Sequence, residues 1–296
     1  MSSIPPQLPA TEIRAPAGAV RRRWLYLILI VTLLFVLMPF LFWQATWFGR
    51  PLTDAQIKKN LADSEHPRKV QHALSQIADR MVSRDPSVRV SARRWYPQVI
   101  ALSASPIEEL RLTAAWVMGQ DNSVAEFHQA LLPLLADPHP MVRRNAALAL
   151  VRFGDAAGRL VILSMLEPYT VLAPQGGTLT QRLKAGDVLN PGTLLGRIEQ
   201  GNKKIEIRSQ VPGTLDRWLS TDGANVSRDD ALMLISPSSE IGWEALRALY
   251  LIGQPEDLPA IERYARGSAG LPNSVRQQAE LTARAIHSRQ LENRKY

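Results

Sequence analysis

Hydrophobic positions follow three different patterns along the 296-residue chain. Near the amino end, the twenty positions 24–43 carry no charged residue. In 52–167 and 237–290, alanine-rich runs with apolar residues on one side predict amphipathic helices. Between them, short alternating runs separated by turn residues predict small β-strands. These patterns divide the chain into a disordered cytoplasmic tail (1–20), a membrane anchor (21–48), a helical region (52–167), a β domain (168–236), a continued helical region (237–290) and a second tail (291–296).

The uncharged run is interpreted as a transmembrane helix, because twenty residues at about 1.5 Å each span a hydrocarbon core of about 30 Å. A cleaved signal peptide is the alternative, but its apolar core is shorter and "FWQATWFGR" offers no good cleavage site. Basic residues precede the run, so the positive-inside rule places the amino terminus in the cytoplasm. We therefore expect a single-pass protein of the bacterial inner membrane, with the lipid bilayer as a partner and most of the chain periplasmic. The predicted anchor residues are Arg21, Arg22, Arg23, Trp24, Trp43 and Trp47.

Charge and cysteine content narrow the classes of function. The net charge is +8, and residues 1–50 contribute +4 of it through five arginines and one glutamate. Without clustered Lys and Arg elsewhere, the charge does not predict a nucleic-acid-binding face. The chain has no cysteine, which excludes disulfides, cysteine nucleophiles and thiolate metal sites.

The helical regions repeat a short pattern. "LADSEHPRKVQHALSQI" (61–77) and "LADPHPMVRRNAALAL" (135–150) both run Leu-Ala-Asp, then His-Pro, then a basic residue and an alanine-rich helix. Shorter copies are "RDPSVRVSARRW" (84–95), "ASPIEELRLTAAWVMG" (104–119) and "LPNSVRQQAELTARAI" (271–286). Asp or Ser before Pro predicts a helix start. Gly119, Gly154 and Gly253 are predicted to end helices in the left-handed conformation.

These motifs resemble the HEAT-repeat family, in particular the short bacterial HEAT-like repeats of the phycobilin-lyase type. The resemblance implies an α-solenoid that binds other proteins. An unrelated helical bundle with similar caps is the alternative. A lyase-like role on a chromophore is a further one, and no residue here supports it.

The β segment contains two similar halves. "VLAPQGGTLTQRLKAGDVLNPGTLLGRI" and "IRSQVPGTLDRWLSTDGANVSRDDALMLI" share Gly-Thr-Leu, and Gly186 with Val188 is matched to Gly223 with Val226. In the same way, Leu194 and Ile198 are matched to Leu232 and Ile235. The segment resembles the barrel-sandwich hybrid of lipoyl and biotinyl domains, which also occurs in periplasmic membrane-fusion adaptors.

The resemblance places a modifiable lysine at a hairpin tip, but this chain departs from the family there. In "EQGNKKIEIRSQVPGTL" the family glutamate falls on Glu199 and the carrier lysine falls on Asn202. Lys203 and Lys204 lie one and two positions further on, and a slip of one residue in a hairpin changes the face presented. We therefore expect no lipoyl or biotin group, with Lys203 as the remaining candidate for modification. Trp218, Lys203 and Lys204 are candidate residues for docking a partner.

Other residues suggest no catalytic site. His66 and His139 precede Pro at two helix starts, which favours a capping or turn role over metal ligation. Glu108 and Glu109 begin a helix, where its dipole favours negative charge. Phosphate-binding loops and nucleophile elbows are absent from the sequence. Five large aromatic residues are assigned to apolar helix faces in the core: Trp95, Tyr96, Trp116, Trp243 and Tyr250.

The sequence thus predicts an α+β multidomain protein: one transmembrane helix and an α-solenoid of HEAT-like repeats, interrupted by a small all-β barrel-sandwich hybrid. We expect a non-catalytic, membrane-anchored scaffold or accessory subunit that binds other subunits of a membrane-associated complex, such as a respiratory or transport complex. No cofactor, metal, nucleic acid or small-molecule substrate is expected. A periplasmic efflux or secretion adaptor and a lipoyl or biotin carrier subunit are the alternatives.

Overall fold

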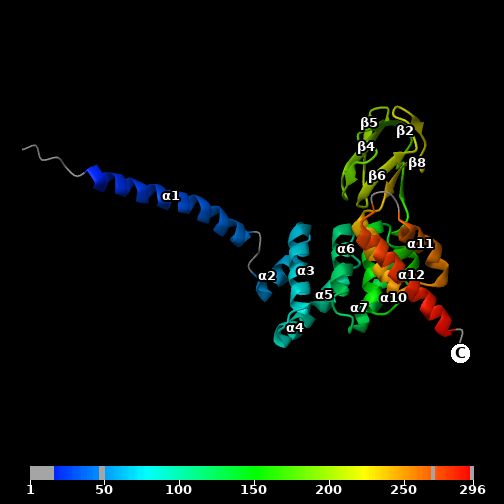
Figure 1. The fold of residues 1–296 in the computed structure, drawn as a ribbon, viewed down its shortest axis with the longest axis horizontal. Coiled ribbons are helices and arrows are strands. Elements are labelled where there is room, and N and C mark those ends of the chain that lie inside the picture. The colour runs from blue at the N-terminus through cyan, green and yellow to red at the C-terminus, as the bar shows by residue number, and fades with distance from the viewer. Residues whose placement is uncertain (1–16, 47–50, 268–270, 294–296) are drawn as a thin grey trace, which may run out of the picture. The chain divides into compact units, whose positions relative to one another are not determined.

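The computed structural model describes residues 17–46, 51–267 and 271–293 (Figure 1). The chain forms two compact units, residues 1–54 and 55–296. In the first unit, α1 (Ala17–Thr46) contains Pro39, and its described side chains are mostly apolar and exposed. α1 begins inside the segment predicted to be a disordered tail.

The predicted transmembrane helix is wrong. Among the residues that the structure describes, no helix is both long enough and apolar enough to cross a bilayer. The predicted fold class is corrected accordingly, and so is the predicted location as a single-pass inner-membrane protein with a periplasmic bulk.

The second unit is mostly helical, with a small β region of two antiparallel sheets. Its longer helices pack in sequence, α3 on α6, α6 on α8, α8 on α10 and α10 on α12. These helices are α3 (Pro67–Met81), α6 (Glu108–Met118), α8 (Pro140–Arg152), α10 (Ser239–Ile252) and α12 (Asn273–Asn293). The shorter elements are α2 (Asp54–Leu61), α4 (Pro86–Ala92), η1 (Arg93–Trp95), α5 (Tyr96–Leu102), α7 (Ala125–Leu131), η2 (Pro133–Ala136), α9 (Arg159–Ser164), η3 (Pro255–Asp257) and α11 (Leu258–Arg266).

An arginine in three of these repeats holds the loop that precedes its own helix. Arg89 Nη1 donates to the carbonyls six and five residues before it, at 2.7 and 3.1 Å. Arg111 Nη1 does the same at 2.9 and 3.2 Å. Arg143 Nη1 does so at 2.7 and 2.9 Å. The repeated arginine of the sequence motif therefore satisfies loop carbonyls that would otherwise lack partners.

The histidines at the helix starts do not cap with their side chains. His66 and His139 are N-cap residues, and neither side chain makes a capping hydrogen bond. His66 Nδ1 instead lies 2.7 Å from Asp63 Oδ1. At the second start, Asp137 Oδ1 accepts from the backbone N–H of His139 at 2.8 Å. The aspartate of the motif therefore fixes the turn that leads into the helix there.

Only one of the three helix-ending glycines is left-handed. Gly154 has φ +74°, whereas Gly119 and Gly253 have φ −68° and −64°. A Cβ on Gly119 would lie 2.9 Å from Ala149 Cβ on the neighbouring helix, whereas one on Gly253 would come closest to the backbone carbonyl of Leu249, in the last turn of its own helix. Neither position therefore needs glycine for a left-handed backbone; at both, the space for a Cβ is taken.

The β region consists of two four-stranded antiparallel sheets around a core of its own. One sheet has the order β1 (Tyr169–Leu172), β8 (Ala231–Ser236), β6 (Gly213–Trp218), β3 (Val188–Leu189). The other has the order β5 (Lys203–Arg208), β4 (Leu194–Gln200), β2 (Gly177–Gln181), β7 (Asn225–Val226). Exchanging β1–β4 with β5–β8 converts the first order into the second. The two halves of the segment are therefore topologically equivalent, and each contributes to both sheets.

The hydrogen bonds correct the residue matching between the halves. Gly186 N donates to Leu215 O and Gly223 N to Leu179 O, each at 2.8 Å, so these contacts are equivalent. Two residues further on from each glycine, Val188 corresponds to Asn225 and is 77 % exposed. The buried pair is Leu189 with Val226, not Val188 with Val226. In the strands that follow, Ile198 corresponds to Ile235, because each pairs with the leucine of its Gly-Thr-Leu motif. Leu195 and Leu232 each lie three residues before these isoleucines, so Leu195, not Leu194, corresponds to Leu232.

The helical array continues across the β insertion. One hydrophobic core contains residues from both sides of the β region, from Ala147 to Ile286. Arg159 Nη1 lies 2.6 Å from Asp257 Oδ1. Tyr264 Oη donates to Leu166 O at 3.0 Å, and Arg263 pairs with Glu167. The β region is therefore inserted between two repeats that still pack on each other.

Candidate functional site

The hairpin tip that the sequence singled out is a two-residue turn between β4 and β5. Gly201 has φ +58° and Asn202 follows it, as expected for the turn types that connect two-residue hairpins. Lys203 and Lys204 are the first residues of β5, and both are exposed. Lys204 Nζ lies 2.7 Å from Glu199 Oε1 on the neighbouring strand. Asn202 thus occupies the tip, and the two lysines lie beside it on opposite faces of the hairpin. That Asn202 replaces a carrier lysine stays a prediction.

Trp218 is tied into the β core. Its side chain is half-buried and packs against that core, and its Nε1 donates to Leu183 O at 2.9 Å. Among the predicted anchor residues, Trp24 is 64 % exposed on α1. Arg21, Arg22, Arg23 and Trp43 belong to α1, but their side chains lie outside the described residues, as does Trp47 entirely.

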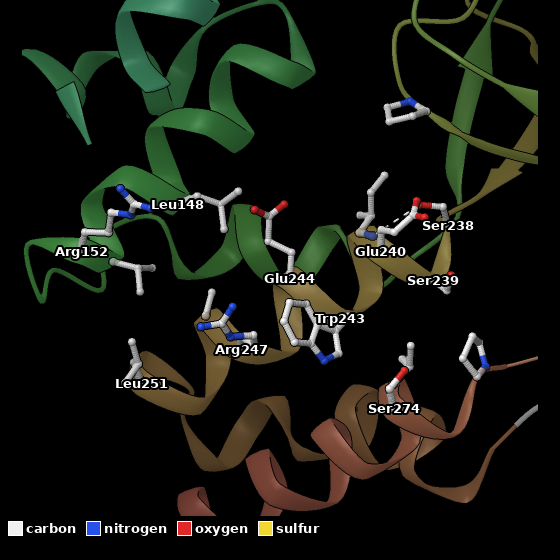
Figure 2. A pocket seen from close by; sticks show the side chains of 16 residues that line it. Leu148, Arg152, Ser238, Ser239, Glu240, Trp243, Glu244, Arg247, Leu251 and Ser274 are labelled. Atoms are coloured by element: carbon white, nitrogen blue, oxygen red, sulfur yellow. Dashed lines mark hydrogen bonds between the residues drawn. The ribbon is translucent and has the colours of Figure 1, made fainter. Parts of the chain in front are cut away.

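A groove that the sequence did not indicate lies over α10. It has a volume of about 820 Å³ and is bounded by α8 on one side and the start of α12 on the other. Figure 2 shows Leu148 and Arg152 from α8 facing side chains of α10. The lining residues are Leu148, Val151, Arg152, Pro212, Ser238, Ser239, Glu240, Ile241, Trp243, Glu244, Arg247, Ala248, Leu251, Pro272, Ser274 and Val275.

The groove combines one aromatic side chain, Trp243, with charged side chains of both signs. The guanidinium of Arg247 lies 4.7 Å from the centroid of the Trp243 ring, one helical turn away (Figure 2). Partial burial in the groove raises the pKa of Glu244, although Arg152 and Arg247 oppose the rise. Arg152 Nη1 donates to Gly119 O at 2.9 Å and to Gln120 Oε1 at 3.0 Å. The groove therefore offers a stacked indole, aliphatic walls and charges of both signs.

One polar contact of the groove is made at the start of α10. Ser238 is the N-cap of this helix, and its Oγ accepts from Ile241 N at 3.4 Å. The same Oγ donates to Glu240 Oε2 at 3.3 Å (Figure 2).

The titratable groups of the described residues do not gather into a metal site. No set of three or more His, Cys, Asp or Glu side chains comes together within ranges 17–46, 51–267 and 271–293. His128 Nε2 lies 2.7 Å from Asp155 Oδ2, and His139 Nε2 lies 3.5 Å from Glu108 Oε2. Each histidine thus makes a local contact with one carboxylate.

The groove was missed because Trp243, which lines it, was assigned to the core together with four other aromatic residues. Trp95 and Tyr96 are buried as predicted, at 7 % and 9 % exposure. Trp116, Trp243 and Tyr250 are 44 %, 38 % and 43 % exposed, so their assignment was wrong. The available signal was the spacing of Trp243 and Arg247, since residues four apart share one face of a helix.

Comparisons with known proteins support the helical repeats. A family model of HEAT repeats matches residues 97–167. This range covers α6 to α9, and it confirms the predicted HEAT-like repeats there. HEAT repeats stack into solenoids that bind other proteins, so the match indicates a protein-interaction scaffold. No curated protein matches the chain. The comparisons confirm neither the lipoyl-like domain nor a membrane anchor.

Two solved structures show only weak likeness. A single-chain, multi-domain long-chain acyl-CoA carboxylase is 18 % identical over 33 % of this chain, with a TM-score of 0.23. The match spans only 10 % of the carboxylase. An engineered protein is 15 % identical, with 80 % of this chain and 98 % of that one covered and a TM-score of 0.34. Neither likeness carries an argument about function.

Proposed function

We propose that this protein is a non-catalytic scaffold whose HEAT repeats hold a segment of a partner protein in the groove over α10. The observation that carries the proposal is the contact between Trp243 and Arg247 on the solvent-facing side of α10. The Arg247 guanidinium carbon lies 4.7 Å from the centroid of the Trp243 ring. Aromatic residues and arginine dominate the binding energy of protein interfaces. Leu251 adds a 61 % exposed aliphatic side chain within the same groove.

The groove determines the chemistry of the segment that it accepts. An apolar side chain of the partner packs against the indole of Trp243 and the Leu148 wall. A carboxylate next to it in the partner pairs with Arg247, whose guanidinium is already held over the ring. Glu240, beside Ser238 at the start of α10, disfavours a second carboxylate at that end of the groove.

We further propose that the β region is a barrel-sandwich hybrid of the lipoyl type that serves as a second docking module and carries no prosthetic group. The equivalent strand orders of its two sheets support the fold. The turn residues Gly201 and Asn202 support the loss of the carrier function, since neither has an amine to modify.

The groove is tested by measuring partner binding after it is altered. Proteins that co-purify with the full-length chain are identified, and the affinity of one of them is measured by calorimetry. Trp243→Ala is expected to weaken binding by about 2 kcal/mol, or about 30-fold, as for a buried interface tryptophan.

The matched control is Trp116→Ala, because Trp116 is similarly exposed on α6 but does not line the groove. This control is expected to bind as the unaltered chain does. If Trp243→Ala and Trp116→Ala bind equally well, the groove is not the binding site.

A further inference from the structure

Arg144 departs from the repeat pattern. Arg89, Arg111 and Arg143 are equivalent, because each makes the same pair of hydrogen bonds to its preceding loop. The residues after them are Val90, Leu112 and Arg144. An apolar position of the repeat is thus replaced by an arginine in α8, and this arginine is only 7 % exposed.

The buried guanidinium has no carboxylate partner within the part of the chain that the structure describes. Its hydrogen bond goes to a thioether, from Nη1 to Met141 Sδ at 3.8 Å. Burial lowers the pKa of Arg144, and the neighbouring charge of Arg143 lowers it further. Glu167 lines the cavity beside Arg144, but its carboxylate is shared with Arg263. Buried charges in proteins are ordinarily paired, so Arg144 lacks the partner expected of it.

A cavity of about 240 Å³ adjoins the guanidinium. It lies where the first turn of α8 and the end of α9 meet β1, and Arg143, Arg144, Tyr169 and Thr170 contribute to its walls. The Tyr169 hydroxyl is engaged, since it donates to Gln210 Oε1 at 2.9 Å. Because Arg143 uses Nη1 for its loop, its other N–H groups and the Thr170 hydroxyl remain as donors beside Arg144.

We propose that this cavity binds a small oxyanion, a phosphate or a carboxylate, with Arg144 as its main ligand. The planar guanidinium presents two parallel N–H groups that match two oxygens of such an anion. The volume suits a single phosphate or a short carboxylate and is small for a nucleotide, because pockets for drug-sized ligands begin near 300 Å³. The bound anion would touch both α8 and β1 and so join the helical array to the β region.

The site is tested on the full-length chain by thermal unfolding at constant ionic strength. Inorganic phosphate and, separately, acetate are titrated against chloride. We expect a saturable rise in melting temperature with at least one of the two oxyanions, as required of a ligand that binds only the folded state. A response to phosphate alone identifies a phosphate site, and a response to acetate identifies a carboxylate site. No saturable response to either overturns the proposal.

Arg144→Leu distinguishes the site from nonspecific effects of salt. Leucine stands at the equivalent position of the preceding repeat, so the variant should fold, and replacing an unpaired buried charge should not lower its melting temperature in chloride. Its affinity for the oxyanion should fall at least about tenfold, since a hydrogen-bonded charged ligand is lost.

The control, Arg217→Leu, removes the same charge from an exposed position in the β region and should keep the full response. Equal responses of Arg144→Leu and the unaltered chain overturn the proposal. So does a loss of response in Arg217→Leu as large as that in Arg144→Leu.

Discussion

The ion pair between Arg159 and Asp257 connects the repeats on either side of the β region, and breaking it should loosen the carboxyl-terminal repeat selectively. Asp257 is 1 % exposed. Its Oδ1 lies 2.6 Å from Arg159 Nη1, and its Oδ2 accepts from Gln254 N at 2.9 Å. In Asp257→Asn the amide oxygen can still accept from Gln254 N, so the change removes mainly the charge that faces Arg159.

The expected cost follows from the burial of the two partners. Removing one member of a buried pair costs about 3–5 kcal/mol, because the other charge is left without its partner. The Arg159 side chain is 25 % exposed and can regain some hydration, which places the cost near the lower end, at about 3 kcal/mol. Since each 1.4 kcal/mol is a factor of ten, opening of this repeat should become about 100-fold more frequent.

Native-state hydrogen exchange measures this effect residue by residue. In a solenoid each repeat contacts only its neighbours, so amide protection should fall about 100-fold in α11 and α12 and remain unchanged in α3 and α6. Asp216→Asn is the control, because Asp216 pairs with Arg217 at the surface, where a pair contributes about 0–1 kcal/mol. Protection in α11 and α12 equal to that of the control would refute the reasoning, and so would an equal loss throughout the helices.

Three further predictions concern packing, modification and pH. In Gly158→Ala the new Cβ would lie 2.6 Å from Ala147 Cβ and 2.7 Å from Ala147 Cα, so denaturant unfolding should show a loss of about 1–3 kcal/mol. Ala147→Gly should not reverse this loss, because the contact with the Cα remains. Intact-mass spectrometry of the chain from its native cells should give the unmodified mass, and a lipoyl or biotinyl adduct on Lys203 would contradict the proposed docking role. Burial raises the pKa of Asp137, but hydrogen bonds from Arg111 and His139 N outweigh burial and hold this pKa below the usual value of an aspartate. The stability that ionised Asp137 contributes is therefore fully present above the usual pKa and is lost as the pH falls through the lower folded pKa, so Asp137→Asn should show a shallower loss of stability on acidification.

Local motifs allowed the repeats to be predicted, because the helix starts form from residues only a few positions apart. Asp85 caps α4 through Ser87 N at 2.8 Å, and Pro86 and Pro140 lie in the first turns of their helices. The match to HEAT repeats over 97–167 agrees with this interpretation. The division into domains stays a prediction.

Three errors in the sequence interpretation concern features that depend on neighbouring parts of the structure and that a local sequence pattern does not reveal. An uncharged run was interpreted as a membrane span. Gly119 was assigned a left-handed conformation that it does not have, since its requirement is the nearby Ala149. Trp243 was assigned to the core, although neighbouring helices leave part of its ring open to solvent.

The sequence by itself determined the local elements, namely the capped helices, the glycine turns and the two similar halves of the β segment. These depend on backbone preferences and hydrogen bonds between residues a few positions apart. Only the tertiary structure decided that the face of α10 with Trp243 and Arg247 stays open, and that Arg144 is buried beside a cavity. Those features depend on the packing of α8 near α10 and β1. The inserted β region separates α8 from α10 in the chain, so no local pattern contains this packing.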